Sequence, residues 1–315
     1  MRRALAAAAA AVLLAAGAAA AQEALVATPA EPFLIEGAAR TPDGLVLSSV
    51  HRARLFRVGA GGALTPFGPE GLQGVFGIAA DPGLGVLWAA SSPTPHDTET
   101  DRPAELLKLD LRTGEVLHRY PGPGGEHAFG DVAVGPDGTV FVADGGTRAL
   151  LVLRPDAAQL ETLVTLPERG SPQGMAVSAD GRVLVFSNYG TGLHRIDLSE
   201  GWDRRDFTAE TLTPIPAPEG AELRGVDGLV RHGDQILAIQ NGTRTHRVLR
   251  LTLATDWAAV TAVTALVEGL EEPTTGFVED GALVFVSRSQ WTDFDREGQP
   301  TSEAPPPAVV SRLPL

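Results

Sequence analysis

The stretch from residue 130 to residue 153 reads GDVAVGPDGTVFVADGGTRALLVL and contains three short apolar runs. The first two runs, Val132–Val134 and Val140–Val142, are separated by Pro136-Asp137-Gly138, and the third is Leu150–Leu153. Asp-Gly between short apolar runs is typical of a tight hairpin, because such turns need a positive φ that Gly adopts at little cost. The stretch therefore predicts three neighbouring antiparallel strands.

The same order of elements recurs six times along the chain. The turns between the first and second runs are Pro42-Asp43-Gly44, Asp81-Pro82-Gly83, Pro136-Asp137-Gly138, Ala179-Asp180-Gly181, Gly233-Asp234 and Asp280-Gly281. The first two runs of each unit are nearly continuous apolar, as in inner strands buried on both faces, whereas the third alternates, as in Leu193–Ile196. Weaker fourth runs lie at residues 160–166 and 260–267.

Six units of four strands around a centre are typical of a six-bladed β-propeller, so we predict an all-β fold with four antiparallel strands per blade. A helical fold is excluded because no stretch after the first 21 residues sustains a 3.6-residue period. A β-sandwich would use similar strands but could hardly place six equivalent units. Residues 24–28 precede the first unit, and we expect them to close the ring as the outer strand of the last blade.

Two long polar loops, at residues 91–104 and 290–307, lie between the second and third strands of their blades. If connections alternate between the two ends of the strands, these loops share a face with the starts of the innermost strands. Loops on a rigid scaffold often carry function, so this face is the candidate functional face.

The first 21 residues are typical of a secretory signal peptide, with a basic start, an apolar run at residues 4–16 and Ala19-Ala20-Ala21 before the expected cleavage. This run is shorter than the roughly 20 residues that span a bilayer, so we expect no stable membrane insertion. We predict export to the bacterial periplasm or medium, and one monomeric propeller domain over residues 22–315. The net charge of −14 argues against a nucleic-acid partner, and the absence of Cys excludes disulfides.

The starts of the innermost strands should converge on the central channel. They hold Glu36, Phe76, Gly130-Asp131, Gln173, Asp227 and Thr274-Thr275. Three carboxylates and an amide around one axis offer the oxygen ligands that hard cations such as Ca²⁺ prefer, which predicts a divalent-metal site. The alternative is that these carboxylates only accept hydrogen bonds from backbone N–H groups at the channel mouth.

The runs Leu34-Ile35-Glu36-Gly37, Gln173-Gly174-Met175-Ala176 and Val226-Asp227-Gly228-Leu229 resemble the senescence-marker-protein/gluconolactonase/luciferin-regenerating-enzyme family of six-bladed propellers. The paraoxonases are more distantly similar. The resemblance implies a channel cation, Ca²⁺ with Zn²⁺ or Mn²⁺ as alternatives, and hydrolysis of lactones or esters. It makes Glu36 and Asp227 metal ligands, with Gln173 at the position of a metal-binding Asn. Gly130 and Ala128 replace an Asn and an Arg of family members, which argues against a sugar-lactone substrate.

For such a hydrolase, Asp227 or Asp131 would activate water, and His127 would be an accessory base, although a single loop His is often structural. The other histidines considered, at positions 51, 194, 232 and 246, are expected to be structural. At the ends of second strands, Asp144, Asn188 and Asn241 are candidates for the pocket rim, with turn capping as the alternative. Trp291 would either form an apolar wall or pack the last loop.

The sequence contains neither a Gly-x-Ser-x-Gly nucleophile elbow nor a Walker-type phosphate loop. The leading hypothesis is therefore a metal-dependent lactone or ester hydrolase without a covalent nucleophile. The alternative hypothesis is a non-catalytic propeller that binds a small molecule or a protein, because the fold by itself implies no activity.

Overall fold

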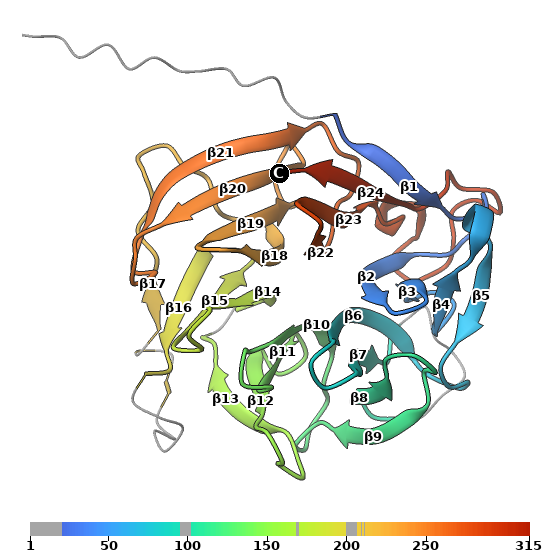
Figure 1. The fold of residues 1–315 in the computed structure, drawn as a ribbon, viewed down its shortest axis with the longest axis horizontal. Coiled ribbons are helices and arrows are strands. Elements are labelled where there is room, and N and C mark those ends of the chain that lie inside the picture. The colour runs from blue at the N-terminus through green and yellow to red at the C-terminus, as the bar shows by residue number, and fades with distance from the viewer. Residues whose placement is uncertain (1–20, 95–101, 168–169, 200–206, 209, 211) are drawn as a thin grey trace, which may run out of the picture.

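The computed structural model describes residues 21–94, 102–167, 170–199, 207–208, 210 and 212–315. These residues form six four-stranded antiparallel sheets arranged around a central axis (Figure 1), which confirms the predicted six-bladed β-propeller. The predicted signal peptide, apart from residue 21, lies outside the described residues, as does the part of the first polar loop at residues 95–101. Within the described part of the chain, no helix is long and apolar enough to cross a membrane.

Each blade consists of four strands, from an innermost strand at the axis to an outer strand at the rim. Blade one contains, in that order, β2 (Ile35–Thr41), β3 (Gly44–Ser49), β4 (Arg54–Val58) and β5 (Leu64–Phe67), and blade two contains β6 (Gly74–Asp81), β7 (Val86–Ser92), β8 (Glu105–Asp110) and β9 (Val116–Pro121). Blade three contains β10 (Phe129–Val134), β11 (Val140–Asp144), β12 (Ala149–Leu153) and β13 (Glu161–Thr165), and blade four contains β14 (Pro172–Val177), β15 (Val183–Asn188), β16 (Gly192–Asp197) and β17 (Thr213–Pro214). Blade five contains β18 (Val226–His232), β19 (Gln235–Gln240), β20 (Arg247–Leu253) and β21 (Val260–Glu268), and blade six contains β22 (Gly276–Glu279), β23 (Ala282–Arg288), β24 (Val309–Pro314) and β1 (Glu23–Ala27).

The ring closes as the sequence predicts. Strand β1 pairs antiparallel with β24, with Val26 opposite Val310, and the two strands lie side by side in Figure 1. Val26 is buried in the cluster that joins blades six and one. The last blade is thus built from both ends of the described chain. Strand β1 covers the edge of β24 that would otherwise be unpaired.

The second strands of the blades are almost completely buried. Every residue of β7, β11 and β15 is buried. Apolar clusters fill the spaces between neighbouring blades, as with blades four and five, where Val185 packs with Leu229 and Ala238. This two-sided burial explains why the second runs are continuously apolar in the sequence rather than alternating.

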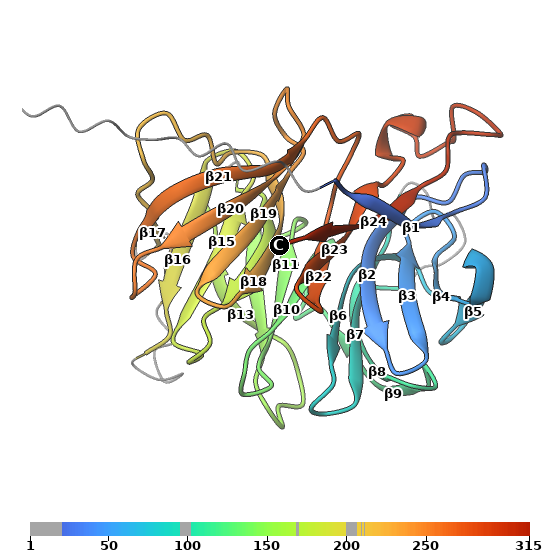
Figure 2. The same ribbon diagram turned by 45° about the horizontal axis from the view of Figure 1, so that its top comes forward.

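The innermost strands of blades one to five share an irregularity at the channel. Their pairing with the second strand shifts register at Glu36-Gly37, Phe76-Gly77, Gly130-Asp131, Gln173-Gly174 and Asp227. A β-bulge re-aims the side chain it carries, and here the bulges fall on the predicted channel residues. The loop between β23 and β24 lies at the same face as the start of β2 (Figure 2), as predicted for the functional face.

Candidate functional site

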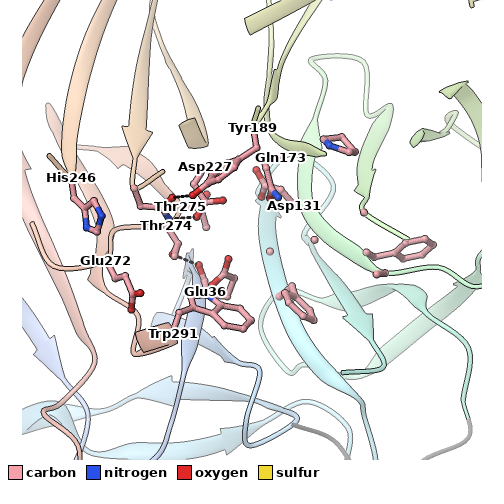
Figure 3. Close-up of a pocket in the computed structure, with 18 of the residues that line it drawn as sticks. Glu36, Asp131, Gln173, Tyr189, Asp227, His246, Glu272, Thr274, Thr275 and Trp291 are labelled. Atoms are coloured by element: carbon pink, nitrogen blue, oxygen red, sulfur yellow. Dashed lines mark hydrogen bonds between the residues drawn. The ribbon is translucent and has the colours of Figure 1, made fainter. Parts of the chain in front are cut away.

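A cavity of about 560 Å³ opens at this face, around the starts of the innermost strands. Glu36, Asp131, Gln173 and Asp227 all line it, each from a different blade (Figure 3). The structure therefore brings together the carboxylates and the amide that the sequence places at the channel. Asn241 and Trp291, two of the predicted rim residues, also line the cavity.

Glycines next to the polar residues let the innermost strands approach one another closely. A Cβ on Gly77 would lie 2.7 Å from Oδ1 and 2.8 Å from Cα of Asp131. A Cβ on Gly174 would lie 2.5 Å from the carbonyl oxygen of Asp227. Only Gly fits at such backbone distances, so these glycines bring the carboxylates of neighbouring blades toward one axis.

Glu36 is half-buried at the side of the cavity formed by blade one. Its Oε2 accepts a hydrogen bond of 2.7 Å from Nε1 of Trp291, in the loop between β23 and β24. Burial, followed by the negative charge of Asp227, raises the pKa of Glu36 well above its ordinary value, and the Trp291 hydrogen bond opposes this rise. Trp291 also stacks on Phe76, with ring centroids 6.3 Å apart. It therefore both forms an apolar wall and holds a carboxylate.

The two aspartates of the cavity differ in the groups that hold them. Burial raises the pKa of Asp131 to about 7, although the Val132 N–H donates to its Oδ1 at 2.9 Å and opposes the rise. Burial also raises the pKa of Asp227 to about 6, opposed by Nδ2 of Asn241, which donates to its Oδ2 at 2.7 Å. Among the described lining residues there is no Lys or Arg, so no protein cation neutralises these carboxylates.

Three further titratable residues that the sequence reasoning did not select line the cavity. The hydroxyl of Tyr189 donates to Oδ1 of Asn241 at 2.7 Å, and burial raises the pKa of Tyr189 to about 12. Glu272 accepts a hydrogen bond of 3.0 Å from the Thr292 N–H, and burial raises its pKa.

The third, His246, was expected to be structural, yet it lies at the cavity beside Glu272 in Figure 3. Its Nδ1 is 2.7 Å from the carbonyl oxygen of Glu271. The signal in the sequence that could have identified these residues is position. Tyr189 directly follows the second strand β15 and His246 directly precedes the third strand β20, while Glu272 lies in the segment before the innermost strand β22, all at the functional face.

His127, Asp144 and Asn188 do not line this cavity. Nδ1 of His127 lies 2.6 Å from Oδ2 of Asp144, and both side chains are buried. Oδ1 of Asp144 accepts hydrogen bonds from the N–H groups of Ala128 at 2.9 Å and Gly146 at 3.1 Å. Oδ1 of Asn188 accepts one from the Ser171 N–H at 3.1 Å. The Gly146 bond corresponds to turn capping, the alternative for Asp144, whereas Asn188 instead bonds the segment that enters β14.

The fit of a metal ion depends on the donors that are present. Within the described residues, no three His, Cys, Asp or Glu side chains are placed so that they could hold a metal ion. The cavity nevertheless contains the four predicted donors Glu36, Asp131, Gln173 and Asp227, and burial raises the pKa values of the three carboxylates among them. Donor type and charge therefore fit a hard divalent cation, and binding one would require these side chains to move closer together.

The sequence matches no protein-family model and no curated protein. The fold is similar to several solved propellers. A structure of a PQQ-bound aldose sugar dehydrogenase from Streptomyces coelicolor is 17% identical, with a TM-score of 0.62 over 94% of this chain and 99% of that one. A candidate glucose dehydrogenase from Thermus thermophilus is 18% identical, with a TM-score of 0.61 over 93% of this chain and 100% of that one. A candidate gluconolactonase is 18% identical, with a TM-score of 0.59 over 94% of this chain and 93% of that one. Identities this low show a common six-bladed fold and no more.

Proposed function

We propose that this chain is an exported, divalent-cation-dependent hydrolase of lactones or carboxylic esters. The observation that carries the proposal is the set of half-buried carboxylates Glu36, Asp131 and Asp227, whose pKa values desolvation raises, around one cavity without a neutralising Lys or Arg among the described lining residues. Keeping several partly desolvated carboxylates ionised without a counter-charge is costly, and a bound cation would remove that cost.

Glu36, Gln173 and Asp227 would hold the cation. Their oxygen donors favour Ca²⁺, with Zn²⁺ or Mn²⁺ as the alternatives to test. The net charge of −14 also attracts cations to the protein as a whole. Asp131, on blade three next to Gln173 of blade four, adds a further negative charge to the lining of the cavity.

The remaining chemistry belongs to the side chains. When bound, the cation would polarise the carbonyl oxygen of the substrate. Asp227 or Asp131 would take a proton from the attacking water, because pKa values of about 6 and about 7 suit a general base near neutral pH. The stacked rings of Phe76 and Trp291 would contact the apolar part of the substrate and limit the entry of water from that side.

The similar structures suggest two different chemistries. The candidate gluconolactonase agrees with a hydrolase. The aldose sugar dehydrogenase is described with bound PQQ, a quinone that carries carboxylate groups. The lining carries four carboxylates and no Lys or Arg among its described residues; the carboxylates are Glu36, Asp131, Asp227 and Glu272. It therefore complements a cation better than it complements an anionic quinone.

The test is hydrolysis of a panel of lactones and aryl esters by the mature protein. Activity is measured after treatment with chelator and again after Ca²⁺, Zn²⁺ or Mn²⁺ is restored. We expect turnover that is lost with chelator, restored by one of the ions, and abolished in Asp227→Asn but retained in the exposed turn variant Asp234→Asn. A folded sample that shows no turnover with any ion would instead favour a propeller that binds a small molecule or a protein without catalysis.

A further inference from the structure

We infer that Tyr189 is a positioning residue that fixes the amide of Asn241, which in turn holds Asp227 with one carboxylate oxygen bound and the other available to the cavity. The catalytic consequence of this inference rests on the proposed hydrolase function. The arrangement of the three side chains does not, because it follows from hydrogen bonds among residues of two blades.

The three residues form a continuous hydrogen-bonded chain. Tyr189 follows β15 in blade four, Asn241 follows β19 in blade five, and Asp227 lies at the start of β18. The Tyr189 hydroxyl donates to Oδ1 of Asn241 at 2.7 Å, and Nδ2 of Asn241 donates to Oδ2 of Asp227, also at 2.7 Å. The same Nδ2 donates at 2.9 Å to the carbonyl oxygen of Pro273, which precedes blade six.

This pattern determines which way the amide of Asn241 points. If the amide were reversed, its oxygen would face the carboxylate of Asp227 and the carbonyl of Pro273, so three acceptors would meet without a proton between them. With Nδ2 toward those two acceptors, Oδ1 faces Tyr189 and needs a donor. The phenol hydroxyl supplies that donor, and it is the partner that satisfies the last polar atom of the amide.

The backbone around Tyr189 holds the phenol in place. The Gly225 N–H donates to the carbonyl oxygen of Tyr189 at 2.7 Å, which ties the residue to the segment that enters blade five. A Cβ on Gly242 would lie 2.6 Å from both Cζ and the hydroxyl oxygen of Tyr189, so the ring lies directly against that glycine. The phenol therefore has little room to turn away from Asn241.

The consequence concerns the two oxygens of Asp227. Asn241 occupies Oδ2, and within the described residues no other hydrogen bond to this carboxylate is formed. A carboxylate with one oxygen fixed has lost much of its rotational freedom, and its second oxygen can act from a constant direction. Removing the phenol hydroxyl should therefore loosen Asn241 first and Asp227 second.

The chain offers a matched control for this test, because its only other tyrosine, Tyr120, lies on the outer strand β9 and packs against Trp88. Tyr189→Phe and Tyr120→Phe each remove one hydroxyl, and only the first lies at the cavity. Thermal unfolding establishes that both variants fold.

The first readout is the side-chain amide signal of Asn241 in a ¹⁵N NMR spectrum of the cation-free protein, assigned by its loss in Asn241→Leu. In the wild type we expect a well-dispersed NH₂ pair that exchanges slowly with water. In Tyr189→Phe the pair should move toward the positions of a free amide and exchange at least about tenfold faster, as expected when a bond worth about 1.4 kcal/mol is lost. In Tyr120→Phe it should stay unchanged. An Asn241 signal that is the same in Tyr189→Phe and wild type overturns the inference.

The second readout is steady-state hydrolysis with the best ester of the panel and saturating cation. Tyr189→Phe should lower kcat about tenfold while KM stays within about twofold, because the loss affects orientation in the transition state rather than substrate binding. An unchanged kcat overturns the positioning role. If the wild type hydrolyses nothing, the proposed function fails, and the NMR comparison still decides whether Tyr189 positions Asn241.

Discussion

Replacing Asp131 with Asn should stabilise the cation-free protein at alkaline pH. Burial raises the pKa of Asp131 from its ordinary 3.8 to about 7, and the charge of Asp227 adds to the rise. The folded protein therefore binds this proton more tightly than the unfolded chain does. Between about pH 4 and pH 7 the unfolded chain carries fewer protons, so the free energy of unfolding falls as pH rises through this window.

The size of the effect follows from the pKa. A rise of the Asp131 pKa from 3.8 to about 7 corresponds to about 4 kcal/mol, which is the most that ionisation of Asp131 can cost the folded state above pH 7. Asn has the same shape without the charge, and its oxygen can still accept from the Val132 N–H. For a domain of this size about 1 kcal/mol moves Tm by about 2 °C. Asp131→Asn should thus raise Tm at pH 8.5 by several degrees, up to about 8 °C.

The assay is thermal unfolding followed by circular dichroism from pH 5 to pH 9 in the presence of chelator. At pH 5 the folded wild-type carboxyl is neutral but the unfolded one is already largely ionised, so the two proteins should differ by only about 3 °C, less than half the difference expected at pH 8.5. Asp234→Asn, in an exposed turn, controls for the loss of one charge far from the cavity. A wild type and Asp131→Asn with the same pH dependence, or a variant that melts earlier at pH 8.5, would refute the reasoning.

Three further predictions use matched pairs of substitutions. Gly174→Ala places a Cβ 2.5 Å from the backbone of Asp227 and should lower the free energy of unfolding in urea by about 1–3 kcal/mol, whereas Gly130→Ala, whose Cβ meets nothing nearer than 3.9 Å, should be close to neutral. Val26→Asp places a charge in the closing strand β1 at a position 6% exposed, and should lower the free energy of unfolding in urea by several kcal/mol. Leu25→Asp, at a position 38% exposed on the same strand, should leave that free energy nearly unchanged. Equal losses in the two variants would contradict ring closure by β1. Trp291→Phe removes the hydrogen bond to Glu36, so the pKa of Glu36 should rise further and calorimetry should show about tenfold weaker Ca²⁺ binding at pH 7, with Trp88→Phe as the control that leaves affinity unchanged.

Much of the candidate site was predictable because the propeller places the starts of all innermost strands at one axis. Glu36, Asp131, Gln173 and Asp227 are identified by position in the repeat, and the structure finds all four at one cavity. The expectation that polar residues at the ends of second strands form the pocket rim was less informative. It selected Asn241, which reaches the cavity, together with Asp144, which caps its own turn, and Asn188, which bonds the Ser171 N–H, and neither of the last two lines the cavity.

Position in the repeat could not separate these strand-end residues, because the direction of a side chain at the end of a strand depends on the turn that follows. Asp144 is followed by Gly145-Gly146 and accepts hydrogen bonds from its own loop. Asn241 instead meets Tyr189, a residue 52 positions earlier in the chain. The partner that decides the role of Asn241 belongs to another blade.

By itself the sequence determined the number of blades, the strand order within each blade and the strand that closes the ring. These features depend on turn chemistry and apolar runs, which are properties of residues close together in the chain. Only the tertiary structure decided that Trp291 binds Glu36 and that Tyr189 reaches Asp227 through Asn241. Those contacts join blades whose residues are distant in sequence, so they exist only once the ring has closed and its bulges have turned the side chains toward the cavity.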